Sequence, residues 1–403
     1  MLRVAIWAGG TLDNIGDQLI ARITRRELCA RLPGIEVQEF CPWNRLNASQ
    51  SIRFDASGDW PPAMQFDAIV VAGGGVFAGA PFKHPMMQVF CFGPRPLRFA
   101  KGVFLAWHGV GLQDGTIPPE QPAWKDHLSA LAERLDYCAV RGDDAAGRMG
   151  MGRMKPEVVP DPVFALPPLE GQPQGGRRRM KIGVALGDAL PRKSFLESMT
   201  GPPTAAVCPY FRDTCLSPDS LRNWDFSPQE ILRKADFLPS VIQALRAVSS
   251  RAEIEFIGFG GIYGDRELAR ELAAQLPGAS LASIEPGEFD DLQRRMQSYD
   301  GLVVSRYHAA ILALRCGKPF VAADPFWTPW MRTSKLHQLM SRIDAAPFYW
   351  TVDGSPGRVE TLVDCLERMI GSRESKDRYS RLHAECISSF DRFATALATA
   401  AQQ

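Results

Sequence analysis

The sequence predicts an α/β protein built of two doubly wound domains that face a cleft. Short apolar runs alternate with segments of helical periodicity through most of the chain, which is typical of parallel sheets. Glycine follows several of the apolar runs, as it does where a strand turns into a loop or a helix. A segment rich in proline and glycine, at residues 160–180, interrupts this alternation near the middle of the chain.

The first half begins with an apolar strand at residues 2–7, followed by a glycine turn and a helix at residues 17–31. Pro33 and Gly34 end this helix. Residues 66–72 are apolar apart from Asp67, which indicates a strand buried on both faces of a parallel sheet. The other expected elements of this half are strands at residues 35–40, 103–107 and 137–140 and a helix at residues 124–135.

The second half repeats the alternation after the linker. Strands are expected at residues 180–186, 254–258, 279–284, 301–305 and 319–323, and helices at residues 228–248, 265–276, 288–298, 309–316, 359–370 and 377–400. The linker separates an N-terminal domain at residues 1–170 from a C-terminal domain at residues 178–403. The last helix is expected to pack back on the N-terminal domain. In such sheets ligands bind at the carboxyl ends of the strands.

Composition places the chain among soluble globular proteins. Its 403 residues are 45% hydrophobic and 23% charged, with a net charge of +1. No basic block points to nucleic acid, and no stretch has the length of a membrane span or the form of a signal peptide. The nine cysteines form no CxxC pair, which argues against a zinc ribbon and a disulfide framework. We therefore expect a cytoplasmic protein.

Two motifs of the first half follow strands. Asn14-Ile15-Gly16-Asp17 begins the first helix, where Asn14 suits an N-cap and Gly16 allows the backbone to approach a ligand. Taken alone, this motif is more simply an ordinary cap with a tight turn. Gly73-Gly74-Gly75 either presents backbone N–H groups to an anion or forms a turn packed against a neighbouring strand. Its spacing does not match the dinucleotide-binding GxGxxG pattern.

A third motif joins Val140-Arg141-Gly142-Asp143 to the later Pro160-Asp161-Pro162. Arg141 stands at a strand end from which it could reach an anion, and Asp161 could orient a loop. Taken alone, an Arg–Asp ion pair that holds the edge of the domain is the simpler interpretation.

The fourth motif, Ser305-Arg306-Tyr307-His308, lies between a buried strand and a helix. A helix N-terminus binds anions through its unpaired N–H groups and the helix dipole. Arginine adds a fork that fits carboxylate or phosphate. A single histidine at such a place is more often a cap or a core residue. The nearby Arg306 and the glycine-rich loops expected opposite favour a functional site.

Together and in this order, the four motifs resemble the polysaccharide pyruvyl transferase family. The matching segments are NxGD, GGG after an early strand, VR[DG] followed by DP-V-F, and SRxH followed by G-x-P, and they span about residues 5–335. The resemblance implies two Rossmann-like domains in a glycosyltransferase-B-like arrangement. It also implies an enzyme that transfers the pyruvyl group of phosphoenolpyruvate to a sugar of an exopolysaccharide or cell-surface glycan. Such a reaction forms a pyruvate ketal, releases phosphate and uses phosphoenolpyruvate as donor substrate without a cofactor.

The resemblance also implies roles for particular residues. Arg306 and His308 match the family's donor-site arginine and histidine, and His308 is our expected general acid because histidine titrates near neutral pH. Asp17 is a weaker candidate for the base. Arg141 and the loop Gly73, Gly74 and Gly75 are expected to add to the donor site.

Two departures from the family pattern affect the expected donor site. The stretch after Arg141 reads Asp144-Ala145-Ala146, where family members often carry serine. The first strand of the second domain ends without the arginine that many members have, so Arg192 or Arg212 would substitute for it. A changed donor or a lost activity would also account for these departures.

On the acceptor side, Asn14, Trp327 and Trp330 are expected to contact the sugar, although burial in the cleft wall is the simpler role for at least one of the tryptophans. No cluster of His, Cys, Asp and Glu has metal-ligand spacing, so no metal is expected. A nucleotide-sugar-dependent glycosyltransferase and a non-catalytic glycan-binding or assembly protein stay open as alternatives. The acceptor sugar, the ketal positions, a lipid link to the acceptor with peripheral membrane association, and the oligomeric state also stay open.

Overall fold

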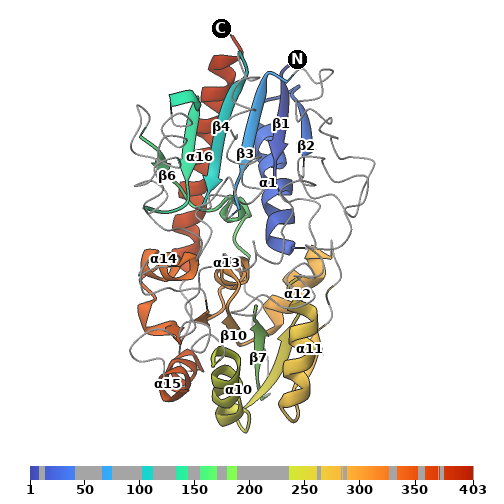
Figure 1. Cartoon of the computed structure of the whole chain (residues 1–403), viewed down its shortest axis with the longest axis vertical. Coiled ribbons are helices and arrows are strands. Elements are labelled where there is room, and N and C mark those ends of the chain that lie inside the picture. Colours follow the sequence, from blue (N-terminus) through green and yellow to red (C-terminus); the bar gives the residue numbers. More distant parts are fainter. Residues whose placement is uncertain are drawn as a thin grey trace, which may run out of the picture.

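The computed structural model describes residues 1–8, 14–40, 66–74, 102–111, 133–143, 155–169, 179–187, 236–260, 265–282, 284, 288–325, 334–352, 359–370, 372 and 376–402. Within these ranges the chain forms two six-stranded parallel sheets, each with helices packed against it. Figure 1 shows the first sheet in the upper half of the molecule and the second sheet in the lower half. The predicted α/β architecture with two doubly wound sheets is confirmed.

The first sheet has the strand order β2-β1-β3-β4-β5-β6. Its strands are β1 (Arg3–Trp7), β2 (Glu36–Phe40), β3 (Ala68–Ala72), β4 (Phe104–Val110), β5 (Tyr137–Val140) and β6 (Glu157–Val158). The strand order reverses between β1 and β3, which is the switch point of a flavodoxin-like sheet. Helix α1 (Ile15–Arg31) follows β1, so its N-terminus lies at this switch point.

The second sheet has the strand order β12-β11-β10-β7-β8-β9. Its strands are β7 (Met180–Ala185), β8 (Ala252–Ile257), β9 (Ser280–Ala282), β10 (Gly301–Val304), β11 (Phe320–Asp324) and β12 (Tyr349–Thr351). Read from β9, this is the dinucleotide-fold order 3-2-1-4-5-6, and its switch point lies between β7 and β10. Helix α13 (Tyr307–Arg315) follows β10 and therefore begins at the second switch point.

The remaining helices of the second domain cover its sheet. They are α10 (Phe237–Val248), α11 (Asp265–Gln275), α12 (Phe289–Ser298), α14 (Lys335–Arg342) and α15 (Val359–Ile370), together with the short 3-10 helix η2 (Ala346–Phe348). Strands β3, β4, β10 and β11 are buried at every position, which explains why they read as apolar runs apart from His108 in β4 and Asp324 at the end of β11. Among the described residues, their side chains and those of the flanking helices contribute to two hydrophobic clusters, of which one holds residues of both domains.

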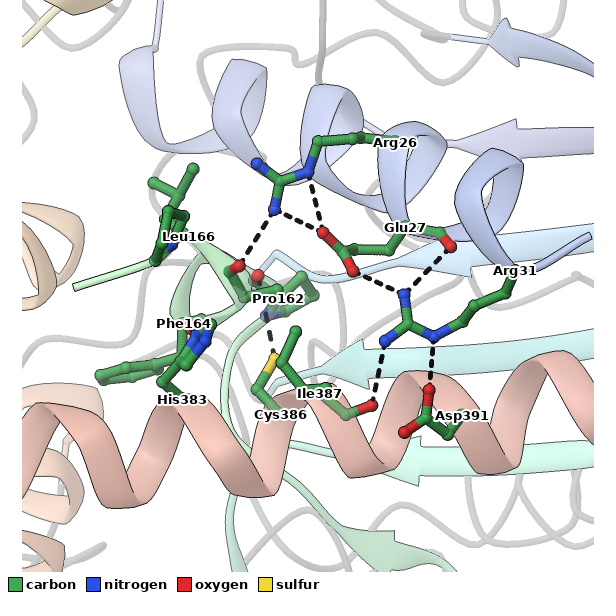
Figure 2. A network of polar contacts seen from close by, with 12 residues as sticks. Arg26, Glu27, Arg31, Pro162, Phe164, Leu166, His383, Cys386, Ile387 and Asp391 are labelled. Carbon is green, nitrogen blue, oxygen red and sulfur yellow. Dashed lines mark hydrogen bonds and ion pairs between the residues drawn. The ribbon is translucent and has the colours of Figure 1, made fainter.

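The long C-terminal helix α16 (Lys376–Ala400) packs against elements of both domains. It contacts α1, β4 and the 3-10 helix η1 (Pro162–Ala165) of the first domain and α13 of the second. Figure 1 shows it running beside the first sheet, with its lower end next to α14. Figure 2 shows polar contacts that join α1, η1 and α16, centred on Glu27 and Arg31.

Three differences from the expected elements have physical reasons. Strand β4 continues to Val110 instead of ending at Trp107, and His108 is fully buried within it. Strands β6 and β12 and the 3-10 helix η1 were not expected, because elements of at most four residues carry no clear periodicity. Helix α14 was not expected either, since its eight residues span little more than two turns. The helix expected at residues 124–135 and the start of the one expected at 228–248 lie mainly outside the described residues.

Candidate functional site

The two switch points face each other across the domain boundary. Asn14, at the start of α1, forms an isolated antiparallel bridge with Gly260, which follows β8. Gly16 of α1 lies directly against the side chain of His308 in α13. The N-termini of α1 and α13 therefore meet at the place where two facing α/β domains bind ligands.

The start of α1 is organised by its cap. The Asn14 side chain accepts a hydrogen bond from the Gly16 N–H (3.1 Å) and donates one to the Asp17 carboxylate (2.8 Å). Burial raises the pKa of Asp17, although the positive charges of His308, Arg141 and Lys335 oppose the rise. A carboxyl group with a raised pKa at a cleft is suited to proton transfer.

Gly16 makes the contact between α1 and α13 possible. A Cβ atom at this position would lie 1.8 Å from the Nδ1 atom of His308, which no side chain could accommodate without movement. Gly16 was expected to let a ligand approach the backbone. In the structure it lets the His308 side chain of the other domain approach the backbone.

Arg141 and Asp161 form a buried ion pair at the edge of the first sheet. Their side chains are 4% and 0% exposed, and one guanidinium nitrogen contacts the carboxylate directly. The other carboxylate oxygen caps η1 by accepting the Val163 N–H (3.0 Å). Burial would raise the pKa of Asp161, but the charges of Arg141 and His308 hold it well below its usual range. Asp161 is therefore a permanent carboxylate at the domain boundary.

His308 faces this carboxylate from the other domain. Its Nε2 atom lies 3.6 Å from the Asp161 Oδ2 atom, and its side chain is 13% exposed. The imidazole is thus held between Gly16 at Nδ1 and Asp161 at Nε2, both from the first domain. The contact places an imidazole, a side chain that can transfer protons, beside a fixed carboxylate at the domain boundary.

Arg306 points away from His308, toward the β7–β8 side of the second sheet. Its guanidinium makes a bidentate ion pair with Asp265 at the start of α11, with Nε to Oδ2 at 2.8 Å. It also lies against Gly187, where a Cβ atom would be 2.3 Å from the guanidinium carbon. The Gly187 N–H donates to the Ser305 hydroxyl (2.6 Å), which ties the ends of β7 and β10 together beneath Arg306.

Gly73 and Gly74 follow β3 at the first switch point. The Gly73 N–H donates to the His108 carbonyl (2.8 Å), and a Cβ atom on Gly73 would meet Ile20 at 2.6 Å. The Gly74 carbonyl accepts from the Gly111 N–H (2.9 Å). Of the two interpretations left open for this loop, these contacts match the packed turn at Gly73, whose N–H is engaged within the sheet.

The structure brings Asn14, Asp17, Arg141 and His308 together and places Arg306 beside them at the second switch point. The expected site residues Gly75, Arg192, Trp327 and Trp330 lie outside the described residues, as does Arg212. Two acidic residues were missed as site residues. The position of Asp161 between two prolines is typical of a capped turn, so its role as a cap could have been predicted from the sequence. Its contact with His308 could not, because the two residues are far apart in the chain. No sequence pattern linked Asp265 to Arg306.

Within the described part of the chain, no group of three or more His, Cys, Asp and Glu side chains is placed to hold a metal ion. In the same part, no helix is both long and apolar enough to cross a membrane.

A model of the polysaccharide pyruvyl transferase family matches residues 14–325, which include Asn14, Asp17, Arg141, Asp161, Arg306 and His308. The chain belongs to the polysaccharide pyruvyl transferase family. Membership in this transferase family supports an enzyme that acts as a transferase. No protein with a curated description matches the sequence.

Solved structures resemble this pyruvyl transferase family member in fold. UDP-GlcNAc 2-epimerase from Methanocaldococcus jannaschii matches with a TM-score of 0.51 and 10% identity over 99% of this chain and 100% of that one. The same enzyme in complex with UDP-GlcNAc and UDP gives a TM-score of 0.53 and 8% identity over 99% of both chains. At such low identity the likeness supports the glycosyltransferase-B-like fold alone.

Proposed function

We propose that this protein transfers the pyruvyl group of phosphoenolpyruvate to a sugar of an exopolysaccharide or cell-surface glycan. The product is a pyruvate ketal, the second product is phosphate, and neither a metal nor a cofactor takes part. The observation that carries the proposal is His308, held at a helix N-terminus against a buried carboxylate of the other domain, within the region that matches the family.

The chemistry requires a proton donor and a proton acceptor. Protonation of the methylene carbon of phosphoenolpyruvate makes C2 electrophilic, and a sugar hydroxyl oxygen adds to C2. The bond between C2 and the phosphate oxygen then breaks, and a second hydroxyl oxygen forms the ketal. Of the two hydroxyl protons released, one replaces the proton given to the methylene carbon and the other leaves with phosphate. The atoms and charges therefore balance without an oxidant or reductant.

In this proposal His308 delivers the proton and Asp17 accepts one. His308 faces Asp161 across the domain boundary, and Asp17 has a pKa raised by burial, which favours proton uptake. Both groups lie at the junction of α1 and α13, on opposite domains.

The donor is proposed to bind on the Arg306 side of His308. Phosphoenolpyruvate carries a carboxylate and a phosphate, and a guanidinium beside the N-terminus of α13 attracts both. Asp265 orients the fork of Arg306. Arg141 is buried and paired with Asp161, so its proposed contribution is to hold Asp161 in place. Gly74 and Gly75 remain candidates for backbone contacts to the donor.

The test combines binding with turnover. Saturation with phosphoenolpyruvate at 100 times its Kd adds about 2.7 kcal/mol of stability, which thermal melting detects as a higher Tm. His308→Gln is expected to retain that shift and to lose about 10²–10⁴-fold in phosphate release with a glycan acceptor. His383→Gln, the same substitution in α16 outside the cleft, serves as the matched control and should keep full turnover.

Three outcomes would contradict the proposal. A Tm shift with nucleotide sugars and none with phosphoenolpyruvate would favour a glycosyltransferase. Glycan binding without phosphate release would favour a non-catalytic binding or assembly protein. Equal turnover in His308→Gln and the control would remove His308 from the mechanism.

The proposed setting is the cytoplasm, or the inner face of the membrane where the acceptor is lipid-linked.

A further inference from the structure

A cavity of about 670 Å³ lies between the domains, and Asp161 and Tyr307 are among the residues that line it. The end of β5, the segment leading to Asp161 and helix α14 supply most of its wall. We propose that this cavity is the acceptor site and that it binds a sugar ring of the glycan chain. The inference rests on the proposed function, whose site it deepens by separating the acceptor from the donor.

Three successive residues at the start of α13 point in different directions. Arg306 reaches toward Asp265 and Gly187, neither of which lines the cavity. Tyr307 lines the cavity, and the Arg141 guanidinium lies 4.8 Å from the centre of its ring. His308 points across the cleft to Asp161. Asp161, the carboxylate that His308 faces, is therefore shared by the proposed proton donor and the cavity.

The charges of the cavity wall are nearly balanced. Arg141 is paired with Asp161, and Arg342 is paired with Glu385. Lys335 and Asp143, which carry opposite charges, line the same wall. Arg306 is paired in the same way with Asp265, so the proposed donor side is distinguished by the N-terminus of α13 and not by an unpaired guanidinium. A wall of nearly balanced charge suits an uncharged ligand rich in hydroxyl groups.

The rest of the wall has the chemistry that sugar hydroxyls need. Gln338, His337 and Ser341 of α14 bring an amide, an imidazole and a hydroxyl, each able to donate and accept hydrogen bonds. The Tyr307 ring adds an apolar surface. The volume falls in the range of about 300–1,000 Å³ that small-ligand sites occupy.

The cavity adjoins the proposed proton donor through a shared carboxylate. Asp161 lines the cavity and lies 3.6 Å from the Nε2 atom of His308. A hydroxyl at this end of the cavity would therefore lie beside the carboxylate that His308 faces.

Two variants of α14 test the assignment. Ser341→Trp fills the cavity from an exposed position, and Gln338→Leu removes an amide while keeping most of the side-chain volume. Ser250→Trp, an exposed serine of the same domain outside the cavity, is the matched control. The probes are the 4-nitrophenyl glycosides of glucose, galactose, mannose and N-acetylglucosamine, observed by saturation-transfer NMR. The donor probe is phosphoenolpyruvate, observed by thermal melting.

We expect at least one glycoside to bind the wild-type protein and the control equally, and to bind both α14 variants at least tenfold more weakly. The phosphoenolpyruvate shift in Tm should be the same in all four proteins. Unchanged glycoside binding in both α14 variants, or no glycoside binding to the wild type, would overturn the inference. Loss of the phosphoenolpyruvate shift in folded α14 variants would overturn it too, because the cavity would then belong to the donor. Glycoside binding at the cavity without any phosphoenolpyruvate shift would support the sugar site and contradict the proposed function.

Discussion

His308 owes its position to residues of the other domain. Asp161 faces its Nε2 atom at 3.6 Å, and Gly16 leaves room for its Nδ1 atom. Neither contact is local in sequence, and both disappear when the domains separate. At the scale of single residues, the proposed proton donor is therefore assembled from two domains, and substitutions on the first domain should alter the chemistry of the second.

Replacing Asp161 by Asn should lower kcat by about 10²-fold, which is the typical effect of a small misplacement of a catalytic group. It should also cost about 3–5 kcal/mol in stability, because Arg141 stays buried without its counter-charge. The double variant Asp161→Asn/Arg141→Met removes that charge and should regain stability without regaining turnover. Thermal melting and steady-state kinetics separate the two effects. Recovery of turnover in the double variant would show that the pair acts only on stability.

Gly16→Ala should lower turnover at least tenfold, because a Cβ atom 1.8 Å from the His308 Nδ1 atom forces the imidazole away from Asp161. Stability of α1 itself should not fall, since alanine is the better helix former by about 1 kcal/mol. In a His308→Ala background the same substitution should cause no further loss of turnover, because the ring is gone. Equal losses in both backgrounds would show that Gly16 acts through something other than His308.

At the scale of elements, α1 and α16 are joined by a polar network around one buried carboxylate (Figure 2). Glu27 is paired with Arg26 and with Arg31, whose Nη1 atom lies 2.6 Å away. Arg31 continues to Asp391 of α16 (2.7 Å), and Arg26 donates to the Ala165 carbonyl of η1 (3.0 Å). The network therefore couples the helix that carries Gly16 to the helix that spans both domains.

Glu27→Ala should destabilise the protein by about 2 kcal/mol, below the full cost of breaking a buried pair because Arg26 is half exposed. Asp391→Ala breaks the same network at a side chain that is 62% exposed and should cost about 0–1 kcal/mol. Urea unfolding of both variants measures the difference. Equal effects would mean that burial of Glu27 adds nothing to the network.

For the molecule as a whole, His108 lies where α16 packs on the first sheet. Its ring lies fully buried between β4 and the aromatic rings of Phe390 and Phe393, and its Nε2 atom is 2.9 Å from the Ser389 hydroxyl. Burial lowers the pKa of His108 from 6.5 to about 3, with Arg31 and Arg392 adding to the fall against the opposing charge of Asp161. The folded protein therefore keeps this histidine neutral.

Because His108 is neutral in the folded protein, the free energy of unfolding should decrease as the pH is lowered. Below pH 6.5 the unfolded chain binds a proton at His108, whereas the folded chain binds that proton only near pH 3 and below. The slope of the free energy of unfolding should approach about 1.4 kcal/mol per pH unit below pH 6.5, which gives a loss of about 1.7 kcal/mol between pH 6.5 and pH 5. His108→Gln should flatten this slope by that amount in urea unfolding at several pH values. An unchanged slope would show that groups other than His108 cause the loss of stability at low pH.

The buried strands, most of the helices and the position of the motifs at strand ends could be predicted from the sequence alone. These features depend on local periodicity and on glycine and proline, which act within a few residues. The strand orders, the packing of α16 against both domains and the partners of His308 and Arg306 required the tertiary structure. Asp161 and Asp265 are ordinary acidic residues in the sequence, and only folding brings each beside its partner. Contacts between distant segments depend on how both sheets pack, which no short window of sequence encodes.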